Sequence, residues 1–395
     1  MGRDYLAFFA SLFLSRLADQ ILLFIVPLMV FQTTHSAAWT GLAFFAEALP
    51  RFLAFPVCGA LCDRFSPVRI LHLSQACRAA ACVLAVAGHG LFDGIYWLVV
   101  LSALCGVLTT QGIMAREVLL PHIFARYSYT RTLSYSQIAD QSGLVLGPLL
   151  AALLLEAMAW QWVVLGVAGL FVLADLAMLA WKRSSAVTLP AFEQQPGPWL
   201  QPLRTALGHI RTLPELQKII CLAVGVNLIV GVTLATSATL VVGVHEQGKD
   251  YYAGLQAVGA GVTIAILFVL ARISLSLRLL GGLSYALILL GGFISGFSPS
   301  IAGYVSGFLL VIGFDKMFNV YMRSVRQRAI PVQDFGKTVG VITLLNNLSQ
   351  PLAGLLVGIL AAPLGARGVV LVLSMASTLI GVAVCWRWFR RVPTT

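Results

Sequence analysis

Twelve long apolar stretches run through this sequence and restrict what it can fold into. Each is about as long as the roughly 20 residues that a helix needs to cross a bilayer. They lie near residues 5–31, 39–61, 68–88, 95–115, 134–157, 160–181, 215–244, 251–271, 277–297, 300–323, 336–361 and 366–388. Charged residues make up only 10% of the chain, far below the roughly 25% of soluble proteins. A water-soluble enzyme is therefore excluded, and the sequence predicts an all-α integral membrane protein with twelve transmembrane helices.

The positive charges predict how these helices are oriented. Alternate connecting segments carry most of the Lys and Arg residues, whereas the intervening segments hold only Lys249 and Arg367. Because basic residues stay on the cytoplasmic side of a membrane, the basic segments and both termini are expected in the cytoplasm. The formal net charge of +11 is thus assigned to contact with the lipid bilayer, and no nucleic-acid partner is expected.

A polar, proline-containing linker predicts two separate bundles. It covers residues 183–214, between an N-terminal six-helix bundle at 1–182 and a C-terminal six-helix bundle at 215–395. Weak internal matches indicate a repeat, so the two bundles are expected to be pseudo-symmetric. Halves of this kind are typical of secondary transporters, which bind substrate between them near the bilayer midplane. The matching positions are Gly41 with Gly254, and Pro148 with Pro351.

The connection between the second and third stretches carries the most specific motif. From Gly59 to Arg69 it reads GALCDRFSPVR and resembles the G-x-L-x-D-R-x-x-x-x-[RK] loop of the major facilitator superfamily. The resemblance implies the major facilitator fold and a latch that closes the cytoplasmic side. Physically, Gly59 permits close helix approach, and Asp63 can cap the next helix or pair with an Arg of a neighbouring helix. The expected latch residues are Gly59, Asp63, Arg64, Arg69, Arg116 and Asp140.

A second motif lies in the stretch at 134–157. Gly143 and Gly147 are four residues apart, so they allow a neighbouring helix to pack closely, and Pro148 bends the helix. The pattern resembles the G-x-x-x-G-P antiporter motif of the same superfamily. This resemblance is associated with export more than with import.

Further segments narrow the resemblance to the enterobactin-exporter and macrolide-efflux branch of the superfamily. The similar segments are Leu49 to Arg51, Ala115 to Pro121 and Arg326 to Pro331. The resemblance implies a location in the bacterial cytoplasmic (inner) membrane. The sequence departs from the branch at His35, where Gly is usual, and in the second-half counterpart of the loop motif, which lacks its Asp.

Ionisable residues inside the first three stretches are the principal site candidates, because each costs about 2.5–3.5 kcal/mol to insert. Arg16 and Asp19 share one face, as do Glu47 and Arg51, and Arg78 lies in the third stretch. Asp19 and Glu47 are assigned to proton coupling, since an apolar cavity raises the pKa of a carboxyl group and a neighbouring Arg lowers it again. Movement between these two environments would take up and release a proton. Arg16, Arg51 and Arg78 are assigned to the substrate cavity or to charge pairs within it.

The second half offers fewer charged candidates. Asp315 and Lys316 are adjacent at depth, and residues adjacent on a helix point about 100° apart, so they are not expected to neutralise each other. Asn227 and Asn346 are neutral hydrogen-bonding groups that either face the cavity or join helices. Outside these positions, Asp140 and Asp175 are expected to pair with arginines such as Arg116 or Arg69.

These residues predict a secondary active transporter. It exports a small amphipathic molecule, either a siderophore or other metallophore, a macrolide-like drug or a secondary metabolite, by proton antiport with alternating access. A lysophospholipid flippase is the alternative, because the stretch after Asp19 resembles that group. An integral-membrane transferase needs clustered acids or a His-Asp pair at one membrane face, and neither is found. The sequence contains no ATPase segment and no metal-ligand spacing, so no metal and no cofactor are expected, and the protein is expected to be a monomer.

Overall fold

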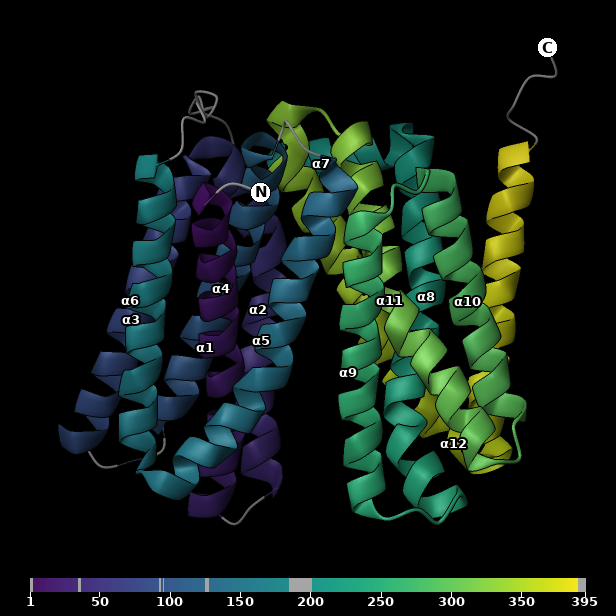
Figure 1. Ribbon diagram of the computed structural model, residues 1–395, viewed down its shortest axis with the longest axis horizontal. Coiled ribbons are helices and arrows are strands. Elements are labelled where there is room, and N and C mark those ends of the chain that lie inside the picture. The colour runs from purple at the N-terminus through teal and green to yellow at the C-terminus, as the bar shows by residue number, and fades with distance from the viewer. Residues whose placement is uncertain are drawn as a thin grey trace. The chain divides into compact units, whose positions relative to one another are not determined.

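The computed structural model describes residues 3–34, 37–91, 94, 96–124, 128–184 and 201–389. The described residues are almost entirely helical (Figure 1). The helices of the first half are α1 (Arg3–Thr34), α2 (Ala37–Arg64), α3 (Pro67–Leu91), α4 (Tyr96–Ile123), α5 (Tyr129–Ala157) and α6 (Trp160–Ser184). The segment that follows residues 185–200 is the short helix α7 (Gln201–Thr212).

The described residues of the second half are also mostly helical. Its helices are α8 (Pro214–Ala238), the π-helix η1 (Thr239–Val244), α9 (Lys249–Arg272), α10 (Leu277–Phe297), α11 (Ile301–Ala329), the 3-10 turn η2 (Val332–Asp334) and α12 (Phe335–Phe389). α12 is interrupted at Gly365, whose φ of 67° is not helical. This glycine therefore separates two helices that correspond to the stretches predicted at 336–361 and 366–388.

The all-α membrane fold is confirmed. Within the part of the chain that is described, ten helices are long and apolar enough to cross a membrane. One boundary differs from the prediction: α4 continues to Ile123, eight residues past the expected end at 115. Arg116, expected in a connecting segment, lies inside a helix instead, because the apolar residues Val118, Leu119 and Leu120 continue the helix and are buried.

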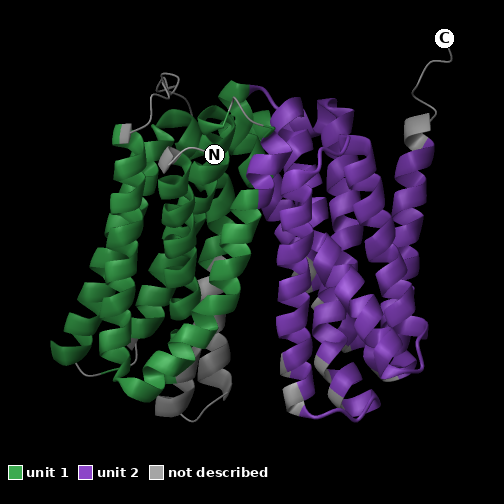
Figure 2. Ribbon diagram, in the orientation of Figure 1, with its two compact units in different colours: residues 1–128, 135–206, 332–341 green, residues 129–134, 207–331, 342–395 purple. Residues whose placement is uncertain are grey.

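The chain forms two compact units (Figure 2). Unit 1 comprises residues 1–128, 135–206 and 332–341, so it includes the first turns of α12, and unit 2 comprises 129–134, 207–331 and 342–395. In unit 1, α1 packs against α2, α4 and α6, and α3 packs against α4 and α6. In unit 2, α11 packs against α8, α9 and α10. The division of the chain into bundles at 1–182 and 215–395 stays a prediction.

Candidate functional site

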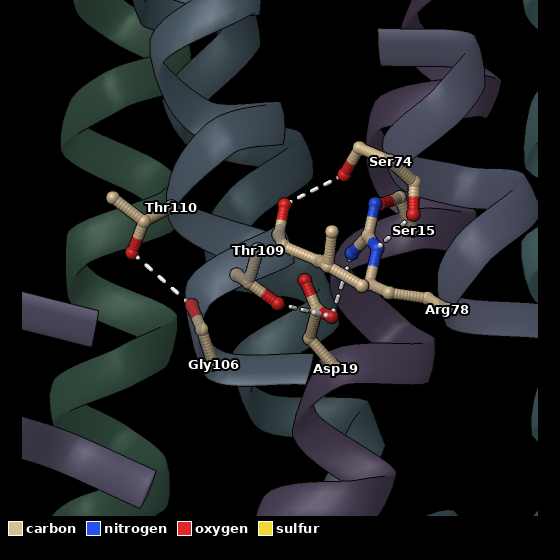
Figure 3. Close-up of polar contacts among 8 residues, drawn as sticks. Ser15, Asp19, Ser74, Arg78, Gly106, Thr109 and Thr110 are labelled. Carbon is tan, nitrogen blue, oxygen red and sulfur yellow. Dashed lines mark hydrogen bonds and ion pairs between the residues drawn. The ribbon is translucent and has the colours of Figure 1, made fainter. Parts of the chain in front are cut away.

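A buried ion pair lies in the middle of unit 1. Asp19 of α1 is 5% exposed and Arg78 of α3 is 1% exposed, and Arg78 Nη1 donates to Asp19 Oδ1 at 2.8 Å. The two side chains point toward one another, with Thr109 of α4 on the other side of the carboxylate (Figure 3). The Thr109 hydroxyl donates to the same Asp19 oxygen at 2.8 Å. One carboxylate therefore joins three helices.

The rest of the Arg78 guanidinium is also held. Its Nη2 donates to the Ser15 hydroxyl at 3.2 Å and its Nε to the Ser74 carbonyl at 3.3 Å. Its Cζ lies 4.4 Å from the centre of the Phe171 ring of α6, within cation–π range. A buried charge is tolerated only when it is paired and hydrogen-bonded. Arg78 meets this requirement with partners from α1, α3 and α6.

Helical spacing accounts for this convergence. Ser15 and Asp19 are four residues apart on α1, and Ser74 and Arg78 are four apart on α3, so each pair shares one helix face. The Ser74 hydroxyl also donates to the Leu108 carbonyl of α4 at 2.6 Å. Ser15, Ser74 and Thr109 were not among the predicted site residues. The four-residue spacing of each serine from a charged residue was the only signal for two of them.

The other charges predicted in spans 1 and 2 are Arg16, Glu47 and Arg51. Arg16 shares α1 with Asp19, yet its Nε is buried without a hydrogen bond among the described residues. The Thr110 hydroxyl donates to the Arg51 carbonyl at 3.1 Å, which ties α4 to α2. Glu47 belongs to α2, but its side chain lies outside the described residues.

A second set of charges lies on α4 and α5, with the two on α4 buried and Asp140 of α5 half-buried. Arg116 is 7% exposed, and it interacts electrostatically with Asp140 and Asp19, which attract it, and with Arg78 and Arg16, which repel it. Glu117, beside it, is also buried and was not predicted. These side chains extend the charge cluster from the Asp19–Arg78 pair along α4. The assignment of Arg116 and Asp140 to the cytoplasmic latch stays a prediction.

The partner of Asp175 is not the one that the sequence predicts. Its Oδ2 lies 2.7 Å from Nδ1 of His72 on α3, whereas an Arg partner was predicted. α3 and α6 pack together, and His72 is the residue of α3 that this packing brings to Asp175. Arg69, one turn before His72, is exposed.

The glycines of the antiporter-like motif pack against α1 beside the ion pair. A Cβ atom at Gly143 would lie 2.9 Å from Cγ of Arg16 and 3.0 Å from the backbone nitrogen of Leu17. A Cβ atom at Gly147 would collide with Cβ of Gln20. Only glycine permits this approach of α5 to the α1 turn that carries Asp19. Pro148 follows within the same helix.

The loop motif lies at one end of unit 1. There Asp63 caps α12, a helix that the sequence analysis did not connect with this motif. Its Oδ1 accepts from the backbone N–H of Gly336 and its Oδ2 from that of Lys337, each at 2.8 Å. These are the first N–H groups of α12, where a carboxylate is stabilised by the helix dipole. Capping of α3, the nearer helix, was one of the two predictions. It is not observed because Asp63 lies in the last turn of α2, so that Ser66, and not Asp63, directly precedes α3.

Close backbone packing holds this cap together. A Cβ atom at Gly59 would collide with the Gly336 carbonyl, and one at Gly340 would collide with the Phe55 carbonyl. Asp63 lies beyond the predicted span 39–61, and burial raises the pKa of its carboxyl to about 7, against the opposing effect of the Lys337 and Gly336 N–H groups. Arg64 is the last residue of α2.

Two predicted positions of unit 2 are joined to each other. Asn227 of α8 donates through Nδ2 to the Asn346 carbonyl of α12 at 3.0 Å. Asn346 in turn lies 3.1 Å from Met322 Sδ, and its Oδ1 is buried without a partner among the described residues. These contacts link α8, α11 and α12.

The expectation for Asp315 and Lys316 is wrong. Lys316 Nζ lies 2.8 Å from Asp315 Oδ2, because the long Lys side chain bends back and overcomes the angle between their Cβ directions. Asn319, one turn further along α11, donates to Asp315 Oδ1 at 3.1 Å. Asp315 is therefore neutralised within its own helix.

Comparison with known proteins agrees with this architecture. The family model described as Major Facilitator Superfamily matches residues 8–329, which is well over half of the chain. The chain belongs to the major facilitator superfamily. It is 23% identical over 385 residues to the uncharacterized MFS-type transporter YfiS of Bacillus subtilis (strain 168), covering 94% of this chain and 90% of that protein. Membership makes it a multi-pass membrane transporter rather than an enzyme.

Solved structures of the superfamily share its fold. A bacterial homologue of the iron transporter ferroportin, in an outward-facing state, matches with a TM-score of 0.76 and 17% identity over 99% of this chain and 100% of that one. The human organic anion transporter MFSD10 (TETRAN) matches with a TM-score of 0.74 and 15% identity over 97% of this chain and 100% of that one. At such identities the matches establish the fold alone.

Proposed function

We propose that this transporter exports a small amphipathic molecule in exchange for protons, with Asp19 as the proton carrier. The observation that carries the proposal is the buried pair of Asp19 and Arg78, which joins α1, α3 and α4. Intramembrane ionisable residues are retained mainly for function, because hydrophobic residues would fill the same space at lower cost. The proposed substrate is a siderophore or other metallophore, a macrolide-like drug or a related secondary metabolite.

Partner exchange at Asp19 supplies the coupling. While Asp19 is ionised, Arg78 and Thr109 hold α1, α3 and α4 together. A proton that reaches Asp19 removes its charge, so Arg78 keeps only Ser15, the Ser74 carbonyl and Phe171 as partners. The contact between α1 and α3 weakens, and the helices of the bundle re-pack around the released guanidinium. Return of Asp19 to Arg78 expels the proton on the other side.

Two further features support alternation between states. The tight packing of Gly143 and Gly147 on α1 transmits a shift of α1 to α5. At the end of unit 1 that is proposed to be cytoplasmic, the Asp63 cap on α12 forms and breaks as the latch. Glu47 is retained in the proposal as a second proton-coupling residue. The protein is proposed to act as a monomer in the bacterial inner membrane, with both termini in the cytoplasm.

A lysophospholipid flippase was the alternative. It rested on a zwitterionic headgroup that binds Arg16 and Asp19 together. Asp19 is already paired with Arg78, and Arg16 lies against Gly143. No contact in the described residues favours the flippase, and the exporter is the function that we propose.

Proteoliposomes with an imposed pH gradient test the proposal. A panel of a catecholate siderophore, a macrolide and a lysophospholipid is offered to the purified protein, and proton movement is followed with an entrapped dye. The siderophore or the macrolide is expected to drive proton movement that is lost in Asp19→Asn. Asp175→Asn is the matched control and is expected to keep it, because Asp175 pairs with the exposed His72. Equal transport with and without the gradient, or a response to the lysophospholipid alone, would contradict the proposal.

A further inference from the structure

We propose that unit 2 binds an oxyanion, either a carboxylate or a phosphate, between Arg367, His245 and Tyr304. The site lies at the end of unit 2 that the charge pattern predicts to be outside the cell. It is separate from the Asp19–Arg78 pair, and it does not depend on the direction of transport.

Three segments far apart in the sequence meet there. Arg367 follows the Gly365 break in α12, His245 follows η1, and Tyr304 lies in the first turn of α11. Arg367 Nη2 lies 3.4 Å from His245 Nε2, and the His245 and Tyr304 rings are 5.8 Å apart. The Arg367 guanidinium and the Tyr304 phenol ring therefore both lie beside the same imidazole.

These groups offer hydrogen-bond donors that lack acceptors. The Tyr304 side chain is 1% exposed, and its hydroxyl has no partner among the described residues. The Arg367 Nε is likewise buried and unpartnered there. Arg367 pairs with no carboxylate of a described side chain, and its recorded neighbour is the His245 ring. Buried donors with no acceptor are satisfied by an oxyanion, which accepts several hydrogen bonds and matches the planar guanidinium.

The hydroxyl of a neighbouring tyrosine, unlike that of Tyr304, has hydrogen-bond partners in the protein. The Tyr252 hydroxyl of α9 lies 3.1 Å from the Ser237 hydroxyl and accepts from Gln256 Nε2 at 3.1 Å. Tyr252 is therefore satisfied by protein groups alone. Tyr304, packed into the same core, is not, because its buried hydroxyl has no hydrogen-bond partner among the described residues.

The scarcity of positive charge on this side strengthens the assignment. Lys249 and Arg367 are the only basic residues in the connections predicted to be outside. Basic residues are depleted there because they oppose the orientation of the protein. A partly buried Arg that is kept at this end needs another reason, and binding of a negative ligand provides one.

The backbone that carries His245 has an unusual form. η1 is a π-helix. Its C-terminal end is closed by two backbone hydrogen bonds, from His245 N to Leu240 O at 2.9 Å and from Gln247 N to Val241 O at 3.0 Å. Glu246 has a φ of 53°, in the left-handed region. Both features occur preferentially at functional sites, where they position a side chain. Here they hold His245 against Arg367.

Protonation of His245 is linked to the ligand. Among the described side chains, the charged and titratable groups around His245 are Arg367 from α12, Tyr304 from α11, and the exposed Glu246 in its own loop. Burial and the Arg367 charge lower the pKa of His245, so the ring is neutral and accepts from Arg367. An anion between the two offsets this repulsion and favours the protonated ring. Affinity for the anion is therefore expected to rise as the pH falls.

Anion-dependent thermal unfolding of the purified full chain tests the site. Sodium acetate and sodium phosphate are titrated against sodium chloride at constant ionic strength, between pH 5.5 and 8. Either oxyanion is expected to raise the melting temperature more at the lower pH. Arg367→Gln is expected to weaken the apparent affinity at least tenfold, Tyr304→Phe to weaken it less, and His245→Gln to remove its pH dependence.

Two matched variants serve as controls. Arg272→Gln removes an Arg that lies over Phe268 at the other end of α9, and Tyr285→Phe removes a hydroxyl that already donates to the Ser377 carbonyl at 2.6 Å. Both are expected to keep the wild-type anion response. Nanodiscs with and without an anionic phospholipid, in phosphate-free buffer, distinguish a lipid headgroup from a free oxyanion. No oxyanion effect in the wild type, or an unchanged effect in a folded Arg367→Gln, would overturn the proposal.

Discussion

Removing either charge of the Asp19–Arg78 pair alone is expected to cost unit 1 much of its stability. Both side chains are buried, and their contact is 2.8 Å long. Asp19→Asn keeps the shape of the side chain and an oxygen that accepts from Thr109, so it removes only the charge. Loss of one partner of a buried pair costs about 3–5 kcal/mol, because the other charge stays buried without compensation. Arg78→Gln is expected to cost a similar amount.

The double variant separates this explanation from a general disturbance. If the two losses were independent, Asp19→Asn with Arg78→Gln would lose about 6–10 kcal/mol, the sum of the two single losses. Without either charge no uncompensated ion remains, so the loss is expected to fall short of that sum by up to about 3 kcal/mol. Thr109→Val removes one hydrogen bond to a charged group and is expected to cost about 1.5–3 kcal/mol.

Unfolding in mixed detergent micelles measures these free energies. Tryptophan fluorescence is a suitable reporter, because Trp181 is buried in unit 1 against Phe8. Asp175→Asn is the control, since a pair with an exposed partner contributes only about 0–1 kcal/mol. A loss below about 1 kcal/mol for Asp19→Asn, or strict additivity in the double variant, would refute the reasoning.

Other predictions concern the helix contacts and the cap on α12. Gly147→Val is expected to destabilise the protein by about 1–3 kcal/mol in the same unfolding assay, since its side chain collides with Gln20. Gly166→Ala is expected to cause no loss, because nothing lies within 4 Å of its added Cβ. Burial raises the pKa of the Asp63 carboxyl in the folded protein to about 7, from an ordinary 3.8. The wild type is therefore expected to lose stability relative to Asp63→Asn as the pH rises from about 4 to about 7. A constant difference across that range would count against a buried Asp63 carboxyl.

The loop motif could be predicted from the sequence, but the contact that Asp63 makes could not. The motif and its spacing are read directly from the residues, and they identify the connection between α2 and α3. Which helix Asp63 caps depends on a contact with Gly336, 273 positions away. No local pattern contains that information, because a carboxylate can cap any helix that packing brings to it.

The sequence by itself determined the class of protein, the approximate positions of the helices and several of the buried charges, Asp19 and Arg78 among them. Apolar length and scarce charge require membrane helices, and that requirement is local to each segment. Only the tertiary structure decided the pairing. Arg16 shares a helix face with Asp19, but Arg78 of α3 binds it, since a guanidinium from a facing helix reaches the carboxylate end-on. Partner choice among buried charges follows from which helix faces pack together, and the packing of α1 with α4, and of α3 with α4, brings Asp19, Arg78 and Thr109 to one point.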